Sequence, residues 1–338
     1  MILFDAIYIN DSGGKVLLDY LISEIEKRNL NVYYLLDSRV KNKIQKIDNN
    51  KLVFIKSTYL NRFRFYLKNK ERFEKVFCFG NISPPIKMNV EVYTYFHNIL
   101  LLSSPNSLPF FFKLKFFLKS KIFKKLAKNT DYWIVQTNLI KNELLNFFSN
   151  DKAYKVSVIP FYPNLEYHGN DSIKRRQNVY LYVSNFTPQK NHNKLIDAFT
   201  RYFDDNNIGE LHITINKNDD NYLLEKVTGL ISNGYPIVNH GFVKQEKLVK
   251  LYRESEYIIY PSLAESFGLG IIEGIENGCK VVGSDLPFLK EICETPFLFD
   301  PNSVESIKEA FEKAQNSKEL LAKQLVYNQI NEIINIIK

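Results

Sequence analysis

The chain has 338 residues, of which 45% are hydrophobic and 24% are charged. This length corresponds to about two domains, and the composition excludes a mostly disordered chain. Basic residues outnumber acidic residues by 45 to 37, which favours acidic partners such as phosphates or anionic lipids.

Cysteine and histidine are sparse. The three cysteines, Cys78, Cys279 and Cys293, have no metal-like spacing, and there are only five histidines, so neither a zinc site nor a disulfide framework is expected. The N-terminal residues lack a basic leader and a cleavage site, and no apolar run approaches the roughly 18 residues of a membrane span. We therefore expect a soluble protein of a reducing compartment.

The first half alternates short apolar runs with helical patterns. Apolar residues at helical spacing follow the first apolar run, from Lys15 onward, and follow the last run again near Leu139. A proline-containing stretch at 156–164, followed by the polar residues 168–178, predicts a domain boundary. The strand candidates are 2–9, 32–36, 52–56, 75–79, 92–96 and 133–135.

The second half repeats this rhythm and ends in two predicted terminal helices. Strands that alternate with helices of about 10–15 residues indicate parallel sheets covered by helices on both faces. The predicted strands are 179–183, 211–215, 237–238, 257–260 and 280–283, and the predicted helices are 191–203, 221–231, 245–253 and 269–276.

Two such sheets predict an α/β protein with two Rossmann-like domains that face each other across a cleft. The domains are expected at 1–162 and 163–320, with 321–338 as a C-terminal helix that packs back on the first domain. Ligands of such folds bind at the carboxyl ends of the strands, so the cleft is the expected site.

The first candidate loop is Ser12-Gly13-Gly14, behind the first strand. Glycines permit a left-handed backbone and a close approach of N–H groups to an anion, toward which the next helix points its positive end. Because the sequence has neither the full dinucleotide fingerprint nor a phosphate loop, an ordinary tight turn is the alternative.

The second candidate loop, 184–191, precedes a helix for which Asn191 is the expected N-cap. A cation at Lys190 would lie beside the positive end of that helix, which is unfavourable unless an anion lies between them. Lys190 is therefore a phosphate-binding candidate, and a solvated surface lysine is the alternative.

The third loop contains two glutamates, Glu265 and Glu273, separated by seven residues that include Ser266-Phe267-Gly268. Gly268 and Gly270 indicate that Glu265 lies in the loop and Glu273 in the first turns of the helix. With a rise of about 1.5 Å per residue, the two carboxylates could straddle a diphosphate held at the helix N-terminus. The alternative is a capping pattern with Ser266 as the N-cap.

This E-x7-E pattern with S-F-G inside it, behind Tyr260-Pro261-Ser262, resembles the retaining glycosyltransferases of family 4, which have the two-domain GT-B fold. The resemblance extends along the whole chain. It includes the Gly-Gly loop, 95–98, 135–137, 158–160, the Lys190 loop, 240–243 and 277–285.

The resemblance implies roles for the residues of the second domain. Glu273 would hold the ribose hydroxyls of the nucleotide, and Glu265 would contact hydroxyls of the donor sugar. The segment Ser266-Phe267-Gly268 would meet the sugar and the diphosphate through the amides of Phe267 and Gly268. Lys190 would neutralise the leaving diphosphate, and Val243 would contact the base through its backbone.

For the first domain, the resemblance implies that the Gly13-Gly14 loop closes over the donor and that His97 faces the sugar. From its sequence surroundings alone, His97 is more readily a structural histidine, since Phe96 and Ile99 flank it.

One position departs from the family. The family usually has arginine five residues before the lysine, where this chain has Asn185. Arginine supplies a permanent charge and a bidentate fork, whereas asparagine donates only a hydrogen bond. Stabilisation of the leaving group would then rest on Lys190 and two helix N-termini, without a metal. Three alternatives stay open: slower turnover, compensation by another basic residue, and a catalytically silent relative.

The basic charge is concentrated between Pro105 and Asp131, where seven lysines and no acid occur among many aromatic residues. Lysines on one helix face and aromatics on the other are typical of a helix that rests on anionic lipid. The alternative is a helix that packs its phenylalanines on the core. A nucleic-acid partner is not expected, because no binding module is recognisable. The residues expected to face the membrane are Lys113, Lys115, Phe116, Phe117 and Lys119.

The resulting hypothesis is a retaining, metal-independent glycosyltransferase without a cofactor. Its donor would be a nucleotide-diphosphate sugar, UDP rather than GDP, and its acceptor a hydroxyl of a lipid-linked glycan in bacterial surface polysaccharide synthesis. The protein would be cytoplasmic and peripheral on the inner face of the membrane. The alternatives are a non-catalytic GT-B subunit that binds a partner transferase or the membrane and, third, an epimerase or phosphorylase of the same fold.

Overall fold

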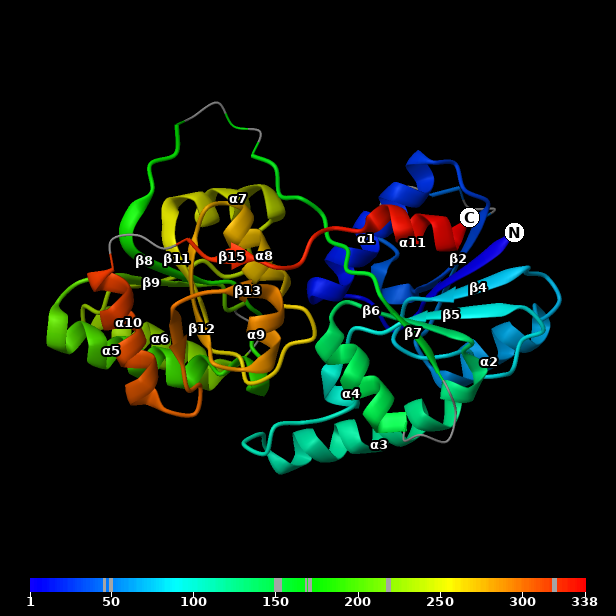
Figure 1. Cartoon of the computed structure of the whole chain (residues 1–338), viewed down its shortest axis with the longest axis horizontal. Helices are drawn as coiled ribbons and strands as arrows, with labels where there is room; N and C mark the ends of the chain where they lie inside the picture. Colours follow the sequence, from blue (N-terminus) through cyan, green and yellow to red (C-terminus); the bar gives the residue numbers. More distant parts are fainter. Residues whose placement is uncertain are drawn as a thin grey trace. The chain divides into compact units, whose positions relative to one another are not determined.

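The computed structural model describes residues 1–44, 47–48, 51–148, 154–167, 169, 172–216, 220–317 and 321–338. The chain divides into two compact units (Figure 1). Unit 1 consists of Met1–Ser104, Pro109–Pro163 and Tyr327–Lys338, and unit 2 consists of Pro105–Leu108 and Asn164–Val326.

Unit 1 is built on a seven-stranded sheet in the order β3-β2-β1-β4-β5-β6-β7. All neighbouring strands are parallel. The central strand β1 is buried along its whole length, as expected for a parallel sheet covered on both faces. The strands are β1 (Ile2–Ala6), β2 (Val32–Asp37), β3 (Leu52–Ile55), β4 (Lys75–Cys78), β5 (Glu91–Tyr95), β6 (Tyr132–Val135) and β7 (Lys155–Val158).

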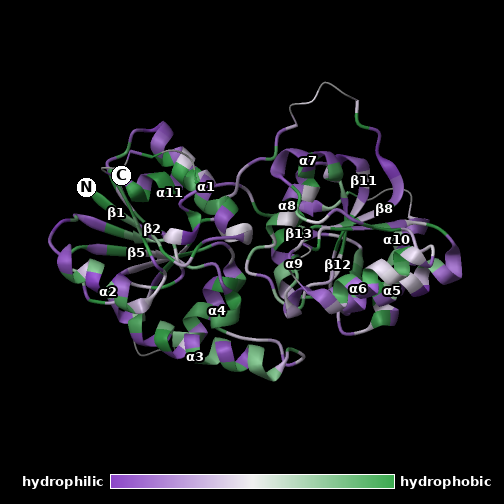
Figure 2. Cartoon of the chain, turned by 180° about the vertical axis from the view of Figure 1, so that it is seen from behind, coloured by the Kyte–Doolittle hydropathy of each residue, from purple (hydrophilic) through white to green (hydrophobic). Residues whose placement is uncertain are grey.

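The helices of unit 1 cover opposite faces of this sheet. The chain moves one way along the sheet from β1 to β2 and the other way from β3 to β4, β5 to β6 and β6 to β7. Because crossovers are right-handed, the first helix lies on one face and the next three on the other (Figures 1 and 2). The helices are α1 (Ser12–Lys27), α2 (Tyr59–Lys68), α3 (Phe110–Leu126), α4 (Asn138–Phe148) and α11 (Ile330–Ile337), with short 3-10 turns at Ser38–Val40, Ile99–Leu101 and Ala127–Asn129.

The C-terminal segment belongs to unit 1, where α11 packs beside α1. Asn328 Nδ2 donates to the hydroxyl of Tyr20 at 3.1 Å, and Lys75 Nζ donates to the carbonyl of Ile336 at 2.7 Å. Four isoleucines of α11 are buried, namely Ile330, Ile333, Ile334 and Ile337.

A buried ion pair joins α2 to the sheet of unit 1. Arg62 and Asp5 are almost completely buried, and their side chains lie 2.8 Å apart. Tyr66 donates to the same carboxylate at 2.7 Å, and Arg62 also donates to the carbonyl of Ser83 at 2.7 Å. Burial of such a pair is tolerated because every charge has hydrogen-bond partners.

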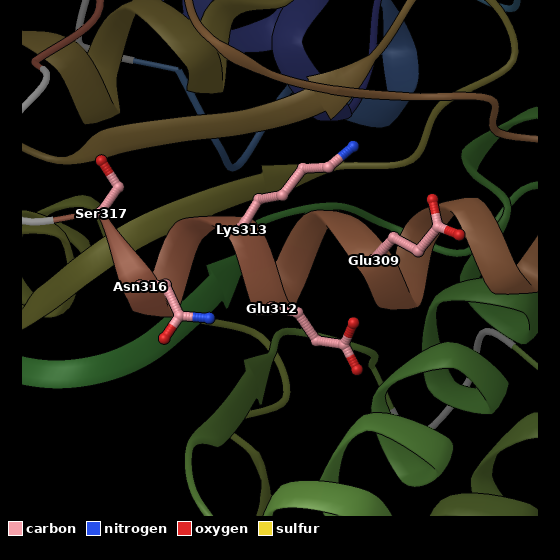
Figure 3. Close-up of a pocket in the computed structure, with 5 residues that line it drawn as sticks. All are labelled: Glu309, Glu312, Lys313, Asn316 and Ser317. Atoms are coloured by element: carbon pink, nitrogen blue, oxygen red, sulfur yellow. The ribbon is translucent and has the colours of Figure 1, made fainter.

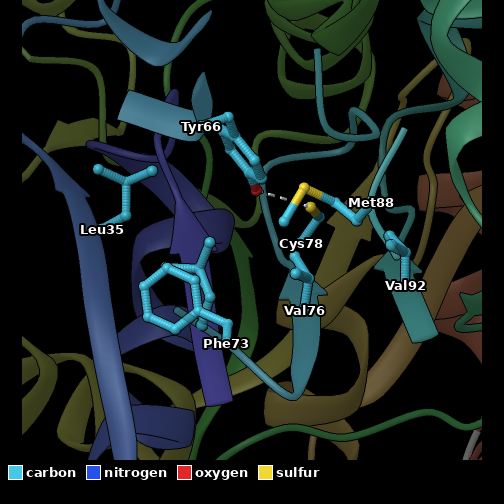
Figure 4. Close-up of a cluster of buried hydrophobic side chains, with 8 residues drawn as sticks. Leu35, Tyr66, Phe73, Val76, Cys78, Met88 and Val92 are labelled. Carbon is cyan, nitrogen blue, oxygen red and sulfur yellow. Dashed lines mark hydrogen bonds between the residues drawn. The ribbon is translucent and has the colours of Figure 1, made fainter. Parts of the chain in front are cut away.

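A cluster of buried hydrophobic side chains, which includes Tyr66, lies in the core of unit 1 (Figure 4). The hydroxyl of Tyr66 also lies 3.6 Å from Cys78 Sγ. Burial of one such large apolar side chain stabilises the fold by about 1.5–3 kcal/mol. The cluster consists of Leu3, Leu35, Tyr66, Phe73, Val76, Cys78, Met88 and Val92.

Unit 2 has a six-stranded parallel sheet in the order β10-β9-β8-β11-β12-β14. The strands are β8 (Arg176–Tyr182), β9 (Glu210–Ile213), β10 (Ile237–Asn239), β11 (Ser255–Tyr260), β12 (Lys280–Ser284) and β14 (Phe297–Phe299), with β13 (Cys293–Glu294) and β15 (Lys323–Gln324) as a short antiparallel pair. The helices are α5 (His192–Asn206), α6 (Asn221–Ser232), α7 (Gln245–Glu254), α8 (Leu269–Glu276), α9 (Pro287–Ile292) and α10 (Val304–Asn316), and a 3-10 turn covers Pro188–Lys190.

The two predicted parallel sheets are confirmed, with differences at the weakest patterns. The strand expected over 2–9 ends at Ala6, because Tyr8 takes a left-handed φ of 83°. Strand β7 lies at the sheet edge inside the stretch expected to be a boundary, and its residues alternate between exposed and partly buried. Three helices and β14 follow β12, where two helices were expected. Within the predicted polar stretch 168–178, residues 168, 170 and 171 lie outside the described residues.

Candidate functional site

In unit 2, the loops at the carboxyl ends of β8 and β11 are joined by hydrogen bonds. The amide of Leu263 donates to the carbonyl of Gln189 at 2.8 Å. The hydroxyl of Tyr182 donates to the carbonyl of Lys190 at 2.8 Å and lies 3.2 Å from Ser262 Oγ. Because β8 and β11 are neighbours in the sheet, their loops meet at the edge where ligands of this fold class bind.

Lys190 and Glu265 form an ion pair across these two loops. Lys190 Nζ lies 2.5 Å from Glu265 Oε1, and the side chains are 24% and 11% exposed. Both ions have lost most of their water, so each needs an opposite charge to be stable in this place. The alternative of a solvated surface lysine is therefore wrong.

The turn from Lys190 into α5 is made by Asn191, which has a left-handed φ of 59°. Asn191 occupies the predicted N-cap position, but its side chain makes no capping hydrogen bond. Its amide instead donates to the carbonyls of Pro261 at 3.1 Å and Pro301 at 2.7 Å. This side chain therefore fixes the Lys190 loop against the loop after β11.

The positions of the two glutamates agree with the prediction. Helix α8 begins at Leu269, so Glu265 lies in the loop and Glu273 in the helix. The N-cap is Gly268 with a φ of 71°, so the alternative of Ser266 as the cap is wrong. The chain needs a left-handed residue here, and a Cβ at Gly268 would lie 2.7 Å from Ile271 Cδ1.

Glu273 is buried, with 6% of the residue exposed. The hydroxyl of Tyr252, from α7, donates to Glu273 Oε2 at 2.9 Å. Burial raises the pKa of Glu273 to about 7, and the hydrogen bond from Tyr252 partly opposes that rise. This carboxyl therefore changes its charge near neutral pH.

A second tyrosine hydroxyl reaches the same part of α8. A Cβ at Gly270 would lie 2.2 Å from the hydroxyl of Tyr260 and 3.1 Å from that of Tyr252. Both tyrosines are buried, and the sequence analysis missed them because they have the pattern of ordinary core residues. The signal that could have found them is Gly270, a glycine inside a helix that leaves room for neighbouring groups.

The loops after β9 and β10 lie at the same edge. Asn239 Oδ1 accepts from the amides of Ile215 at 3.0 Å and Gly241 at 3.1 Å, and Thr214 Oγ1 accepts from the amide of Ser184 at 3.0 Å. Hydrogen bonds therefore link the ends of four consecutive strands of the sheet, β10, β9, β8 and β11. The predicted residues Asn185, Lys190, Val243, Glu265, Ser266, Phe267 and Gly268 all lie in these loops, Asn185 exposed and Val243 partly buried.

In unit 1, the structure brings the predicted Gly14 and His97 together. A Cβ at Gly14 would lie 3.4 Å from His97 Cε1, whereas Gly13 has no atom within 4 Å of that position. The amide of His97 donates to Asn81 Oδ1 at 2.6 Å, and its ring packs 5.1 Å from that of Phe79. Burial lowers the pKa of His97 to about 4, so the imidazole is neutral at pH 7. Its Nε2 is buried and has no hydrogen-bond partner among the described residues.

The Gly-Gly segment differs from the expected loop. Helix α1 begins at Ser12, so Gly13 and Gly14 belong to its first turn. The left-handed conformation falls on Ser12, with a φ of 56°. Gly14 therefore lies against His97 at ordinary van der Waals distance and shows no left-handed backbone.

The prediction of two distinct faces on α3 is wrong. Successive residues of a helix are turned by about 100°, which distributes Lys113, Lys115 and Lys121 around the axis. Phe116 and Lys113 are partly buried, while Lys115, Phe117 and Lys119 are exposed. The alternative of phenylalanines packed on the core holds for Phe123, which is buried against Phe96 and Trp133, and in part for the partly buried Phe112 and Phe116. Figure 2 shows hydrophobic and hydrophilic residues mixed along α3.

Other features of the described residues add no catalytic group. A pocket on the surface of α10 is lined by Glu309, Glu312, Lys313, Asn316 and Ser317 (Figure 3), none of which belongs to the loops above. No group of three or more His, Cys, Asp or Glu side chains in the described ranges is placed to hold a metal ion. In those ranges, no helix has both the length and the low polarity that crossing a bilayer requires.

Comparisons with known sequences find similarity over part of the chain. Residues 165–331 match the family described as glycosyl transferases group 1. The serotype-specific mannosyltransferase WbdA of Escherichia coli is 33% identical over 75 residues, which are 22% of this chain and 9% of that protein. The O-antigen chain mannosyltransferase B of Escherichia coli is 38% identical over 68 residues, 20% of this chain and 18% of the relative. The matches thus span less than a fifth of these relatives.

Solved structures show the same fold over nearly the whole chain. Sucrose-phosphate synthase from Thermosynechococcus elongatus is similar with a TM-score of 0.69 and 16% identity, covering 100% of this chain and 94% of that one. HepE from Anabaena, solved with UDP-glucose, gives a TM-score of 0.71 and 15% identity, covering 93% and 89%. The fold is therefore GT-B. Together with the family match over residues 165–331, this fold supports the general class of glycosyltransferases.

Proposed function

We propose that this chain is a retaining glycosyltransferase of family 4, which transfers a sugar from a nucleotide-diphosphate sugar to a hydroxyl of a glycan. The observation that supports this most directly is the ion pair of Lys190 and Glu265, 2.5 Å apart at the strand ends of unit 2. Glu273 lies in the helix that begins just after the same loop. A cation paired with one carboxylate, with a second carboxylate in the following helix, fits the binding of a diphosphate and the hydroxyls of its sugars.

Each charged side chain has one role in this proposal. Lys190 neutralises the leaving diphosphate, aided by the N-termini of α5 and α8, which favour anions. Glu265 accepts from hydroxyls of the transferred sugar, and Glu273 accepts from the ribose. Asn185 contributes a hydrogen bond to the diphosphate, and His97, neutral at pH 7, faces the sugar from unit 1.

The remaining predicted contacts are made by the backbone. The amides of Phe267 and Gly268, in the segment that starts at Ser266, donate to the sugar and the diphosphate. Val243 contacts the base, and the Gly13-Gly14 turn closes over the donor. UDP-sugars are the preferred donor class, since HepE was solved with UDP-glucose and the pneumococcal O-GlcNAc transferase GtfA with UDP and GlcNAc.

The proposed transfer step is consistent with these roles. The acceptor hydroxyl attacks the anomeric carbon from the face that the diphosphate leaves, a bond forms from its oxygen to that carbon, and the carbon–diphosphate bond breaks. The proton of the hydroxyl passes to a diphosphate oxygen, so the step needs no protein nucleophile. Preorganised positive charge at the leaving group supplies the stabilisation, and the proposal therefore uses neither a metal nor a cofactor.

We further propose a lipid-linked glycan of a bacterial surface polysaccharide as the acceptor. The Escherichia coli relatives, named as serotype-specific and O-antigen mannosyltransferases, support this class of product. The exposed Lys115, Phe117 and Lys119 of α3 support peripheral contact with the anionic inner face of the cytoplasmic membrane.

A second candidate function is a non-catalytic GT-B subunit. It is favoured by Asn185, which stands where the family usually has arginine and supplies no charge to a diphosphate.

The test uses the purified full chain and a panel of UDP- and GDP-sugars. A bound donor raises the apparent melting temperature by mass action, and donor hydrolysis or transfer is then measured with the stabilising sugar. Lys190→Ala and Glu265→Gln are expected to abolish turnover. Lys226→Ala is the matched control, since Lys226 forms an ion pair of the same 2.5 Å length with Asp197 on another part of unit 2. Absence of any nucleotide effect on the unmodified protein would favour the non-catalytic subunit.

A further inference from the structure

Two segments of unit 1 contain basic residues and no acidic ones. Residues 51–70 contain six lysines and arginines, and residues 92–130 contain seven lysines. These 13 charges exceed the net charge of +8 of the whole chain, so the rest of the chain is net negative. The first segment contains α2 and the second contains α3.

The two helices lie on the same face of the unit 1 sheet. Both connect strands in the same direction along the sheet, from β3 to β4 and from β5 to β6. Right-handed crossovers place such helices on one face, and Figures 1 and 2 show α2 and α3 on the side opposite α1 and α11. The sides of α2 and α3 that do not touch the sheet therefore turn to the same exterior.

The outer side of α3 is apolar and basic at once. Phe111 is 82% exposed, Phe117 54% and Leu118 56%. The exposed Lys121 follows Phe117 by four residues, and the exposed Lys125 follows Lys121 by four. This spacing places both lysines on the same side of the helix as Phe117 and Leu118.

The outer side of α2 has the same composition. Leu60 is 52% exposed and Leu67 is 55% exposed, and Arg64 and Lys68 are exposed beside them. Its inner side is fixed, because Arg62 forms the buried ion pair with Asp5. The orientation of α2 is therefore determined by its core contacts, and its apolar outer residues stay exposed.

Among the described residues, Arg64, Lys68, Lys121 and Lys125 form no ion pair with a carboxylate. Lysines four residues apart, such as Lys121 and Lys125, repel each other on a helix. Exposed apolar area combined with unbalanced positive charge indicates a partner that is both apolar and anionic.

We infer that the outer sides of α2 and α3 form one membrane-docking surface. Helix α2 is a second membrane contact, in addition to the one already proposed for α3. The surface is defined by Leu60, Arg64, Leu67 and Lys68 of α2 and by Phe111, Phe117, Leu118, Lys121 and Lys125 of α3. This inference rests on the proposed membrane attachment and extends it. The occupant is an anionic bilayer, since the apolar side chains can enter the interface while the long basic side chains reach the headgroups.

The experiment is co-sedimentation of the full chain with phosphatidylcholine vesicles and with vesicles that also contain phosphatidylglycerol. The unmodified protein is expected to sediment with the anionic vesicles only. Arg64→Glu/Lys68→Glu on α2 and Lys121→Glu/Lys125→Glu on α3 are each expected to lower the partition coefficient at least about tenfold. Leu60→Ser/Leu67→Ser tests the apolar contribution of α2 without a change of charge and is expected to lower it several-fold.

The matched control is Lys290→Glu/Lys313→Glu, which makes the same change of charge at exposed positions of unit 2 and is expected to bind like the unmodified protein. If both α2 variants bind vesicles as well as the unmodified protein and only the α3 variant loses binding, the role of α2 is overturned. The proposed membrane attachment would then still stand. No sedimentation of the unmodified protein would overturn both. A dimer in solution that the α2 variants dissociate, without vesicle binding, would assign this surface to a second copy of the chain and overturn the inference.

Discussion

The hydroxyl of Tyr252 donates a hydrogen bond of 2.9 Å to the carboxylate of Glu273, and both groups are buried in unit 2. Glu273 is the residue proposed to hold the ribose, so the state of its charge determines whether it can accept two hydroxyls. A tyrosine from α7 thus assists a carboxylate on α8.

Tyr252→Phe is expected to weaken donor binding several-fold at pH 7 and much less at about pH 9. The hydrogen bond from Tyr252 lowers the pKa of Glu273, so its removal leaves a larger fraction of the carboxyl protonated at neutral pH. The measurement is the donor dissociation constant as a function of pH. Tyr257→Phe is the control, because its buried hydroxyl donates at 2.7 Å to the carbonyl of Ala314. Equal pH profiles for the two variants would contradict the prediction.

Glu273→Gln is expected to raise the free energy of unfolding at pH 8 and to change it little at about pH 4. Burial raises the pKa of Glu273 from 4.5 to about 7 in the folded state, so the folded chain binds more protons than the unfolded chain between these values. Stability is therefore lost as the pH rises through this window, by about 3 kcal/mol in all. Urea unfolding of both proteins at several pH values measures this difference. A glutamine variant that is less stable at pH 8 would show that the ionised carboxylate stabilises the fold.

Gly270→Ala is expected to destabilise unit 2 by about 1–3 kcal/mol and to weaken donor binding. The new methyl group would lie 2.2 Å from the hydroxyl of Tyr260 and 3.1 Å from that of Tyr252, so α8 or both tyrosines must move. Gly229→Ala in α6 is the matched control. Nothing lies within 4 Å of its Cβ position, and alanine in a helix interior is favourable by up to about 1 kcal/mol. Thermal unfolding and donor titration test both variants, and equal stability of the two would be the contrary result.

Asn185→Arg is expected to raise kcat/KM for the donor by about tenfold or more. The exposed side chain at 185 precedes Lys190 by five residues, and arginine adds a permanent charge and a bidentate donor for a diphosphate. Steady-state kinetics with the best donor from the panel measure the change, with Asn185→Gln as the uncharged control. An unchanged rate would indicate that another cation already serves the diphosphate.

The sequence alone predicted the fold, and it predicted which glutamate lies in a loop and which in a helix. The alternation of apolar runs and helical patterns predicted both sheets, and Gly268 correctly separated the loop glutamate from the helix glutamate. The sequence pattern failed where the tertiary structure decides. The three-residue strand β14 is too short for a periodic signal, and the faces of α3 depend on which residues the sheet covers.

The sequence also could not predict which side chains contact one another. Lys190 and Glu265 are separated by 75 residues in the chain and meet because β8 and β11 are adjacent in the sheet. Tyr252 and Tyr260 have the composition of core residues, and only their three-dimensional contacts with Gly270 and Glu273 distinguish them. The burial of Arg62 could likewise not be predicted, because its partner Asp5 lies 57 residues away in the chain.

The return of the chain to unit 1 at Tyr327 has a consequence for biosynthesis. All of unit 2 is translated before α11. The side of α1 next to Tyr20 therefore lacks its C-terminal partner while more than 160 intervening residues are synthesised. Truncation after Val326 would leave unit 2 whole and unit 1 unfinished. Residues 327–338 therefore complete unit 1 only after unit 2 has been translated.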